Sequence, residues 1–504
     1  MPYCTGQAHE TRSRPQAGCR GDQSRANSRL GVCRSGAAVS LSTERRARLG
    51  FLSAFFGAYD DVMGPGFRLT QSQLVAENRA VLERVFEVVN FGMISSPEEA
   101  GSVAGKIAAS GIEVLVYAPA MVAPPAWIEI ALRDLTCPIL IWSATRQDSV
   151  PEALDHLQAT VHTSLVGATM ISNCLVRSQK RFAVVDAVPG RPADEARLIR
   201  SVTAAVAAHR LTTAVALRIG TPIAGYRDVE STPGELATLG VREVSIPVAE
   251  LEAAFAGIAA TDVTAEIERL QARPGWSAPP TASSAASARL ALAMRRLADE
   301  HGATLGTVNC HSHWLRQNRQ IGIVACLGVS LMHEAGIPFS CTGDLPAAMA
   351  GLLAKTLSGS SLYCELYVRE PASDDFLVAA GGEGDPGWAE GEVTVVPNQY
   401  YPGNCGAGLG VRFALRAGPA TLIAMTPTAE AWRMIWATGE ITGRSFPRLD
   451  GPNGMFRFTV QPGHRAAEEW ITAGPTHHPA LAHGLLDLEL PLVARLARLE
   501  VVRI

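Results

Sequence analysis

The stretch that decides the fold is residues 305–383, which read LGTVNCHSHWLRQNRQIGIVACLGVSLMHEAGIPFSCTGDLPAAMAGLLAKTLSGSSLYCELYVREPASDDFLVAAGGE. Apolar runs of strand length alternate here with longer helical runs, and polar residues gather at the turns between them. The order is strand, loop, helix, strand, helix and strand, and the stretch closes in a glycine-rich turn. Because strands joined by helices run parallel in one sheet, the stretch predicts a parallel sheet covered by helices.

The same alternation runs back toward the N-terminus. Strand-like apolar runs are found at residues 49–55, 86–94, 112–118, 138–142, 182–186, 214–219 and 243–246, with helical stretches between most of them. We therefore predict a first α/β domain over residues 46–162 and a second over residues 163–355. Beyond Glu365 the strands are short and separated by turn signals, which predicts a mainly antiparallel β domain over residues 356–504. The predicted fold class is α/β, with two parallel-sheet domains followed by this β-rich C-terminal domain.

Residues 1–45 differ from the rest of the chain. They are rich in arginine, serine and glycine, contain no lysine, and show almost no apolar periodicity. Such a segment buries too little apolar surface to offset the entropy lost on ordering, so we predict a disordered extension. A transit peptide, which has a similar composition, is the alternative.

The composition narrows the class of protein. The chain has 504 residues, of which 47% are hydrophobic and 18% charged, and its net charge is −4. That charge gives no long-range attraction for nucleic acid or anionic lipid, and no apolar run reaches the roughly 18 residues that a membrane helix needs. Ten cysteines are too sparse for a disulfide scaffold. We expect a cytoplasmic globular enzyme without a nucleic-acid or membrane partner.

Two glutamates are candidates for chemistry. Glu365 lies in the strand-like run at residues 362–368, where alternation places it on one face with Tyr363 and Tyr367. A buried carboxylate there would need a partner, whereas an edge-strand glutamate would face water. Glu383 lies between glycines, which let the backbone approach a ligand closely. The alternative for Glu383 is an ordinary surface turn.

Asp344 follows Cys341, Thr342 and Gly343 and precedes an apolar helix that has Pro346 in its first turn. This position predicts a helix N-cap more strongly than a catalytic carboxylate. The two roles are compatible, because a cap at the end of a strand lies where α/β sheets bind ligands.

Four histidines are candidate ligands or substrate contacts. His311 and His313 would share one face if they lay in a strand, and nearby Arg316 suits an anionic substituent. A solvated polar loop is the alternative for this segment. His477 and His478 are adjacent, and on an extended segment they would point in opposite directions, so we expect at most one to hold a metal. The alternative is a core histidine bonded to a carbonyl.

Several motifs together resemble one family. The run from Trp470 to His478, followed by Leu499–Val502, is similar to the end of L-arabinose isomerases. The turn Cys341–Asp344 resembles the Glu-Gly-Asp turn of the L-fucose and L-arabinose isomerase superfamily. Thr421 and Leu422 fall in a segment that resembles its Gly-Pro-x-Thr-Leu motif.

The resemblance implies two α/β domains, a C-terminal β domain, and the interconversion of aldoses and ketoses through a cis-enediol. It implies Mn²⁺, with Mg²⁺ as the alternative, and a homo-oligomer that is a trimer or hexamer. Carried onto this chain, the metal ligands are Glu365, Glu383 and His478 or its neighbour His477. The expected catalytic carboxylates are Glu365, Glu383 and Asp344, and the expected contacts to the sugar are His311, His313 and Arg316.

The chain departs from the family pattern at two places. Thr342 stands where the fucose branch has a glutamate ligand, and the extra histidine of the arabinose branch has no clear counterpart near Asp375 and Phe376. His311 or His313 would compensate. Two alternatives therefore stay open: an epimerase or lyase that acts on a modified sugar, and a sugar-binding protein without catalysis.

Overall fold

The computed structural model describes residues 46–64, 66–146, 149–277, 283–310, 313–398 and 408–504. The predicted extension at residues 1–45 lies outside this range. None of the helices in the described ranges combines the length and apolar character needed to cross a membrane.

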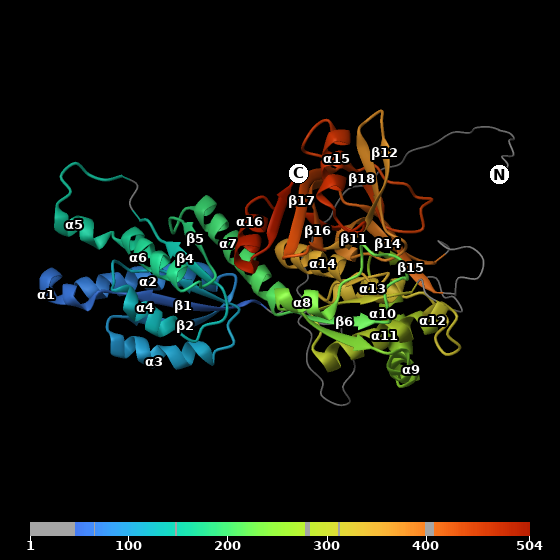
Figure 1. The fold of residues 1–504 in the computed structure, drawn as a ribbon, viewed down its shortest axis with the longest axis horizontal. Helices are drawn as coiled ribbons and strands as arrows, with labels where there is room; N and C mark the ends of the chain where they lie inside the picture. Colours follow the sequence, from blue (N-terminus) through green and yellow to red (C-terminus); the bar gives the residue numbers. More distant parts are fainter. Residues whose placement is uncertain (1–45, 65, 147–148, 278–282, 311–312, 399–407) are drawn as a thin grey trace, which may run out of the picture. The chain divides into compact units, whose positions relative to one another are not determined.

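The first sheet has five parallel strands in the order β2-β1-β3-β4-β5 (Figure 1). Its central strand, β3, is almost wholly apolar and fully buried, as expected when helices cover both faces. The strands are β1 (Arg48–Ala54), β2 (Glu87–Ile94), β3 (Val114–Tyr117), β4 (Ile139–Ser143) and β5 (Phe182–Asp186). The main helices are α2 (Phe67–Glu83), α3 (Pro97–Ala108), α4 (Pro125–Leu132) and α6 (Ser164–Arg177).

The membership of β5 differs from the expected grouping. The sequence predicts that residues 182–186 belong to the second α/β domain, but β5 pairs in parallel with β4 and completes the first sheet. Helix α6 supplies the crossover between the two strands, so the repeating unit continues past residue 162. The boundaries of the predicted domains otherwise stay a prediction.

The second sheet has four parallel strands in the order β10-β9-β6-β7. They are β6 (Val215–Ile219), β7 (Arg242–Ile246), β9 (Leu305–Val308) and β10 (Phe339–Ser340). Helix α7 (Pro192–Thr212) packs against β3, β4 and β5 of the first sheet and leads to the second sheet. The helices of the second part are α8 (Pro233–Leu239), α9 (Val248–Ala256), α10 (Ala260–Gln271), α11 (Ser284–His301), α12 (His313–Arg316), α13 (Cys326–Glu334) and α14 (Leu345–Ser358). Because β9 and β10 are parallel neighbours, the polar turns that follow them meet at one edge of the sheet.

The third sheet is a mixed sheet of eleven strands, mostly antiparallel. Its strands are β8 (Trp276–Ser277), β11 (Leu362–Tyr363), β12 (Glu365–Glu370), β13 (Asp375–Ala379), β14 (Ala389–Pro397), β15 (Leu409–Leu415), β16 (Gly418–Pro427), β17 (Trp432–Ile441), β18 (Asn453–Phe458), β19 (Ala480–His483) and β20 (Glu500–Arg503). Helices α15 (Gly463–Ala473) and α16 (Glu489–Ala497) accompany it. The fold class predicted from the sequence is confirmed, although β8, β13, β17, β19 and α15 were not predicted.

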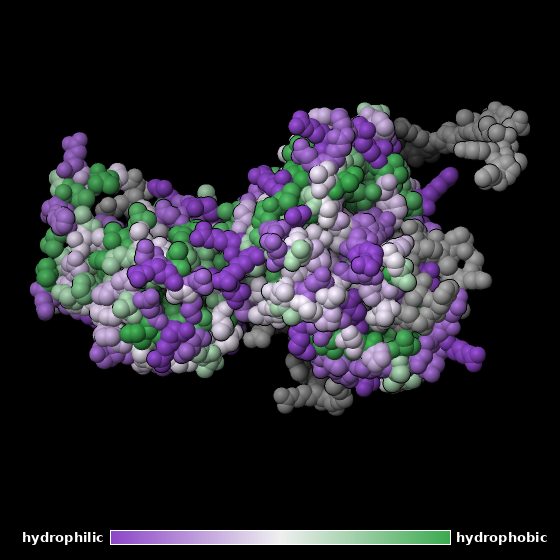
Figure 2. Space-filling model, viewed as in Figure 1, coloured by the Kyte–Doolittle hydropathy of each residue, from purple (hydrophilic) through white to green (hydrophobic). Residues whose placement is uncertain are grey.

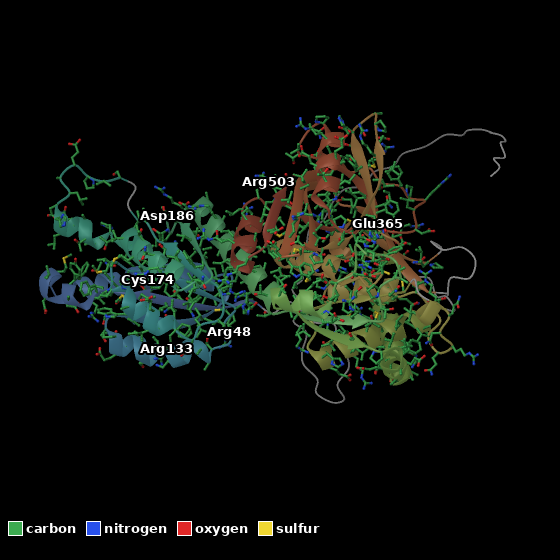
Figure 3. The ribbon with its side chains drawn as sticks, in the orientation of Figure 1. Arg48, Arg133, Cys174, Asp186, Glu365 and Arg503 are labelled. Atoms are coloured by element: carbon green, nitrogen blue, oxygen red, sulfur yellow. The ribbon has the colours of Figure 1, made fainter. Side chains whose placement is uncertain are left out.

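The visible surface carries a mixture of hydrophilic and hydrophobic side chains (Figure 2). Figure 2 shows hydrophilic side chains over much of the visible face, with hydrophobic ones interspersed among them. Figure 3 labels Glu365 within the C-terminal β-rich part of the ribbon, where β12 carries it. The candidate site is built around this residue.

Candidate active site

A cavity of about 270 Å³ lies where the second and third sheets meet. It gathers residues from the loop after β6, the ends of β9 and β10, the start of α13, strands β11 and β12, and the turn after β13. The predicted site residues that line it are Arg316, Glu365, Glu383, His477 and His478. Segments remote in the sequence therefore converge on one cavity.

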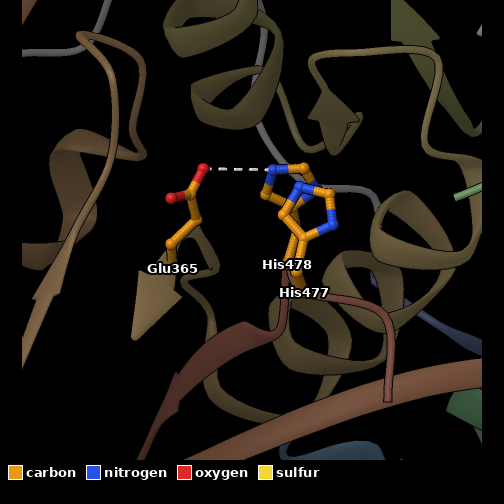
Figure 4. A group of neighbouring side chains, drawn as sticks. All are labelled: Glu365, His477 and His478. Atoms are coloured by element: carbon orange, nitrogen blue, oxygen red, sulfur yellow. Dashed lines mark ion pairs between the residues drawn. The ribbon is translucent and has the colours of Figure 1, made fainter. Parts of the chain in front are cut away.

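Glu365, His477 and His478 form a group within this cavity (Figure 4). Each offers one potential ligand atom, and these atoms all lie within 4.8 Å of one another. Oε1 of Glu365 is 3.3 Å from Nε2 of His478. The Glu365 side chain is 35% exposed, so it is neither a core residue nor a freely solvated edge residue. Glu383 lines the same cavity but is not a member of this close group.

Asp344 both caps a helix and orients a histidine. Its Oδ1 accepts a hydrogen bond of 2.8 Å from the backbone N–H of Ala347, which confirms the predicted N-cap of α14. Its Oδ2 lies 2.9 Å from Nδ1 of His478, and both side chains are buried. A carboxylate at Nδ1 holds the proton there and leaves Nε2 to face Glu365.

His477 is oriented by a carboxylate that the sequence did not reveal. Oδ2 of Asp228, in the loop after β6, contacts Nδ1 of His477 and accepts a hydrogen bond of 3.2 Å from its backbone N–H. Asp228 lies 249 residues before His477 in a polar loop, and no motif marks it. The two histidine rings thus share one arrangement. In each ring a carboxylate contacts Nδ1, and Nε2 is the atom left to bind a cation.

The expectation that His477 and His478 point in opposite directions is wrong. Their ring centroids are 3.6 Å apart, and both side chains line the cavity. The alternation rule does not apply because these residues precede β19, which begins only at Ala480. Asp228 contacts the ring of His477 and Asp344 contacts the ring of His478, and these contacts orient both rings toward the cavity.

The charges of Glu365 and His478 are coupled. Burial alone would lower the pKa of His478, but its hydrogen bonds to Asp344 and Glu365 raise that pKa to about 9. Burial would likewise raise the pKa of Glu365, but the hydrogen bond and charge of His478 lower it overall. The pair is therefore ionic when no cation is bound, and binding of a cation would release the imidazolium proton.

Glu383 is in a different environment. It is only 5% exposed, so the interpretation as a surface turn is wrong. Burial, followed by the nearby Cys310, raises its pKa to about 7. A carboxyl group that titrates near neutral pH suits proton transfer better than permanent charge.

The turn at Thr342 and Gly343 is held tightly. Thr342 is buried with φ of 62°, and its hydroxyl donates a hydrogen bond of 2.7 Å to the carbonyl of Cys341. Gly343 has φ of 87°, and a Cβ at this position would lie 2.5 Å from Cα of Pro222. Only glycine fits there, so the turn that delivers Asp344 has little freedom.

The remaining predicted contacts are described in part. His311 lies outside the described residues, and so does the side chain of His313, whose backbone begins α12. Arg316 ends α12 and is the only arginine or lysine among the described residues that line the cavity. Of the three predicted sugar contacts, the structure thus places Arg316 at the cavity.

The close group has the donor chemistry of a divalent-cation site. Two imidazoles and one carboxylate form a mixed nitrogen and oxygen set, which is suited to Mn²⁺ and also to Fe²⁺, Co²⁺ or Zn²⁺. Both imidazoles have the carboxylate partner that metal-binding histidines usually have. These residues therefore fit a divalent cation.

Sequence comparisons with known proteins match this chain to sugar isomerases. Residues 362–500 match the family of the L-arabinose isomerase C-terminal domain. The chain is 24% identical over 403 residues to a sulfoquinovose isomerase from Alkalicoccus urumqiensis, an alignment that covers 78% of this chain and 86% of the relative.

A solved periplasmic solute-binding protein of an ABC transporter from Actinobacillus succinogenes 130z, with bound D-allose, was also found. It is 12% identical, covers 54% of this chain and 82% of its own, and has a TM-score of 0.15, which is too low to carry a structural argument. The matched C-terminal domain and the long alignment with a sugar isomerase agree with the motifs around Asp344 and His478. These matches support the predicted likeness of the chain to the L-fucose and L-arabinose isomerase superfamily of sugar isomerases.

Proposed function

We propose that this protein is a metal-dependent aldose–ketose isomerase that acts through a cis-enediol on a sugar with an anionic substituent. The observation that carries the proposal is the group formed by Glu365, His477 and His478, which shares a cavity with a glutamic acid that titrates near neutral pH. Mn²⁺ is the proposed cation and Mg²⁺ the alternative.

Glu365, His477 and His478 would hold the cation at the cavity wall. When bound, a divalent cation polarises a sugar carbonyl and acidifies the neighbouring C–H. Asp228 and Asp344 keep the two imidazoles in the required tautomer, so neither ring has to reorient on binding. Asp228 and Asp344 thus orient the two histidine ligands before a cation binds.

Glu383 is proposed to move the proton between the two carbons. Its carboxylate form accepts the proton from one carbon, and the resulting acid returns it to the adjacent carbon of the enediol. A pKa of about 7 makes both directions accessible at neutral pH. Glu365 has a different function from Glu383. Besides holding the cation, Glu365 would move the proton of the sugar hydroxyl group.

Two findings support an anionic sugar. Arg316 is the only cationic side chain with fixed charge among the described lining residues, and its guanidinium suits a sulfonate or carboxylate. The relative that aligns with 78% of the chain is a sulfoquinovose isomerase, and sulfoquinovose carries a sulfonate. We therefore propose a sulfonated hexose as the first substrate to test. The cytoplasmic location and the trimeric or hexameric state remain predictions.

The test is a substrate and metal panel. Protein stripped with a chelator is reloaded with Mn²⁺, Mg²⁺ or no metal, and is assayed with sulfoquinovose, L-arabinose and L-fucose. We expect Mn²⁺-dependent conversion of sulfoquinovose to its ketose, and we expect the Glu365→Gln variant to lose it. Glu370→Gln is the matched control, because Glu370 lies on the same strand, pairs with Arg444 and is remote from the cavity lining.

The other outcomes decide between the alternatives. A product with altered stereochemistry but no change from aldose to ketose would favour an epimerase. This alternative is motivated by Thr342, which stands where the fucose branch of the family has a glutamate. Sugar binding without turnover or bindable metal would favour a sugar-binding protein. Wild-type activity in Glu365→Gln would overturn the assignment of this residue.

A further inference from the structure

Thiols gather at the cavity in a way that the proposed isomerisation does not require. Of the six cysteines in the described part of the chain, four line the cavity, namely Cys310, Cys326, Cys341 and Cys364. The Sγ atoms of Cys310 and Cys341 are 3.2 Å apart, and each residue is at most 3% exposed. Cys310 follows β9 and Cys341 follows β10, so the two thiols meet where these parallel strands end.

We propose that Cys310 and Cys341 are an oxidisable dithiol: a hydroperoxide converts them into a disulfide at the cavity wall, and the disulfide lowers activity. The cross-link stands independently of the proposed function, whereas the loss of isomerase activity rests on it. Contact between the two sulfur atoms is the observation that carries the proposal.

The chemistry balances with a hydroperoxide as the oxidant. One thiol attacks the peroxide oxygen to give a sulfenic acid and releases water or an alcohol. The second thiol then attacks the sulfenic sulfur, the S–O bond breaks, and the hydroxyl leaves as water with the thiol proton. The two sulfur atoms must approach by about 1 Å to reach the bond length of a disulfide.

Neighbouring groups offer a route for the protons. The thiol of Cys326 is hydrogen-bonded with Cys310, and Glu383 is hydrogen-bonded with Cys326. The hydrogen bond with Cys310, followed by burial, raises the pKa of Cys341, which keeps this thiol protonated at rest. The pair should therefore react slowly and respond to sustained rather than brief oxidation.

The turn after Cys341 connects the dithiol to the cation site. Thr342 and Gly343 hold left-handed backbone conformations, and Gly343 lies against Pro222. Asp344 follows directly with its hydrogen bond to His478. A displacement of Cys341 toward Cys310 must be absorbed within these three residues. Formation of the disulfide is therefore expected to disturb the orientation of the His478 ring.

The experiment uses the full-length protein treated with hydrogen peroxide and then alkylated under denaturing conditions. Peptide mapping by mass spectrometry is expected to find a Cys310–Cys341 cross-link that dithiothreitol reverses. Activity is expected to fall by about tenfold with the cross-link and to return on reduction, the scale typical of a disturbed partner of a metal-binding histidine. Cys341→Ser should give no cross-link and keep its activity in peroxide.

Cys364→Ser is the matched control for cross-linking. Cys364 is buried and lines the same cavity, but its thiol contacts the carbonyl of Pro479 at 3.5 Å. The Cys310–Cys341 cross-link should still form in this variant. Recovery of Cys310 and Cys341 as alkylated thiols after peroxide, or a cross-link from Cys310 to Cys326 instead, would overturn the proposal. A complete Cys310–Cys341 cross-link without loss of activity would overturn the proposal that the disulfide lowers activity. Peptide mapping of the wild-type protein tests whether the cross-link forms, even if a variant fails to fold.

Discussion

Replacing Asp344 separates two functions that one side chain performs. In Asp344→Asn, the amide oxygen can still accept from the N–H of Ala347, so the cap of α14 is retained. The amide NH₂ then faces Nδ1 of His478, which must become an acceptor and shift its proton to Nε2. An Nε2–H cannot bind a cation, so the variant should keep its fold but bind the cation more weakly.

The magnitudes follow from the two contacts. Loss of a charge-assisted hydrogen bond costs about 1.5–3 kcal/mol of unfolding free energy. Asp344→Ala removes the cap as well, which adds about 1 kcal/mol, and it leaves the histidine without any partner at Nδ1. Metal affinity should fall about 10- to 100-fold in both variants.

The assay combines urea unfolding of the metal-free protein with calorimetric titration of Mn²⁺. Asp155→Ala is the control, because Asp155 caps α5 (His156–Val161) through a bond of 2.7 Å to Gln158 and is remote from the cavity lining. It should lose stability without losing metal affinity. Wild-type Mn²⁺ affinity in Asp344→Asn would refute the claim that this carboxylate sets the tautomer of His478.

Three further predictions address other parts of the structure. Asp228→Asn should weaken Mn²⁺ binding through His477 but change the unfolding free energy by less than about 0.5 kcal/mol, since both side chains are substantially exposed; equal losses in both measurements would contradict it. Gly343→Ala should yield little folded protein, because the added Cβ meets Pro222 at a residue with φ of 87°, whereas Gly359→Ala, with φ of 80° and open space around the Cβ, should fold. Burial lowers the pKa of His333 from 6.5 to about 4, so the unfolded chain binds the extra proton between these values. Stability should therefore be full above pH 6.5 and fall by roughly 3 kcal/mol as the pH drops through 4; an unchanged slope in His333→Gln would assign that loss to other groups.

Local signals made much of the fold predictable. Asp344 followed by Pro346 marks the start of α14, and Gly302 ends α11 with φ of 63°, because both depend on neighbouring residues alone. Strand β17 escaped prediction although it forms ten residue pairs with β16, because its buried pattern is set by strands on both sides rather than by alternation. The grouping of β5 with the first sheet likewise depends on pairing, which the sequence does not express.

The candidate site was predictable only where a side chain acts within its own motif. Glu365 and His478 were found from a strand pattern and a family resemblance, and the structure brings them within 3.3 Å. Asp228 could not be found, because its function depends on a contact across 249 residues. The contact of Cys310 with Cys341 arises for the same reason, from two strands that become neighbours only in the folded sheet.

The most direct test of the proposed cation site is the stoichiometry and affinity of Mn²⁺ binding in a set of single variants. We expect one tightly bound ion per chain in the wild-type protein. Glu365→Gln and His478→Gln should lose this ion, while Glu383→Gln should keep it and lose only turnover. A wild-type chain that binds no divalent cation, or a Glu383→Gln variant that loses the ion as fully as Glu365→Gln, would contradict the assignment of the cation to Glu365, His477 and His478.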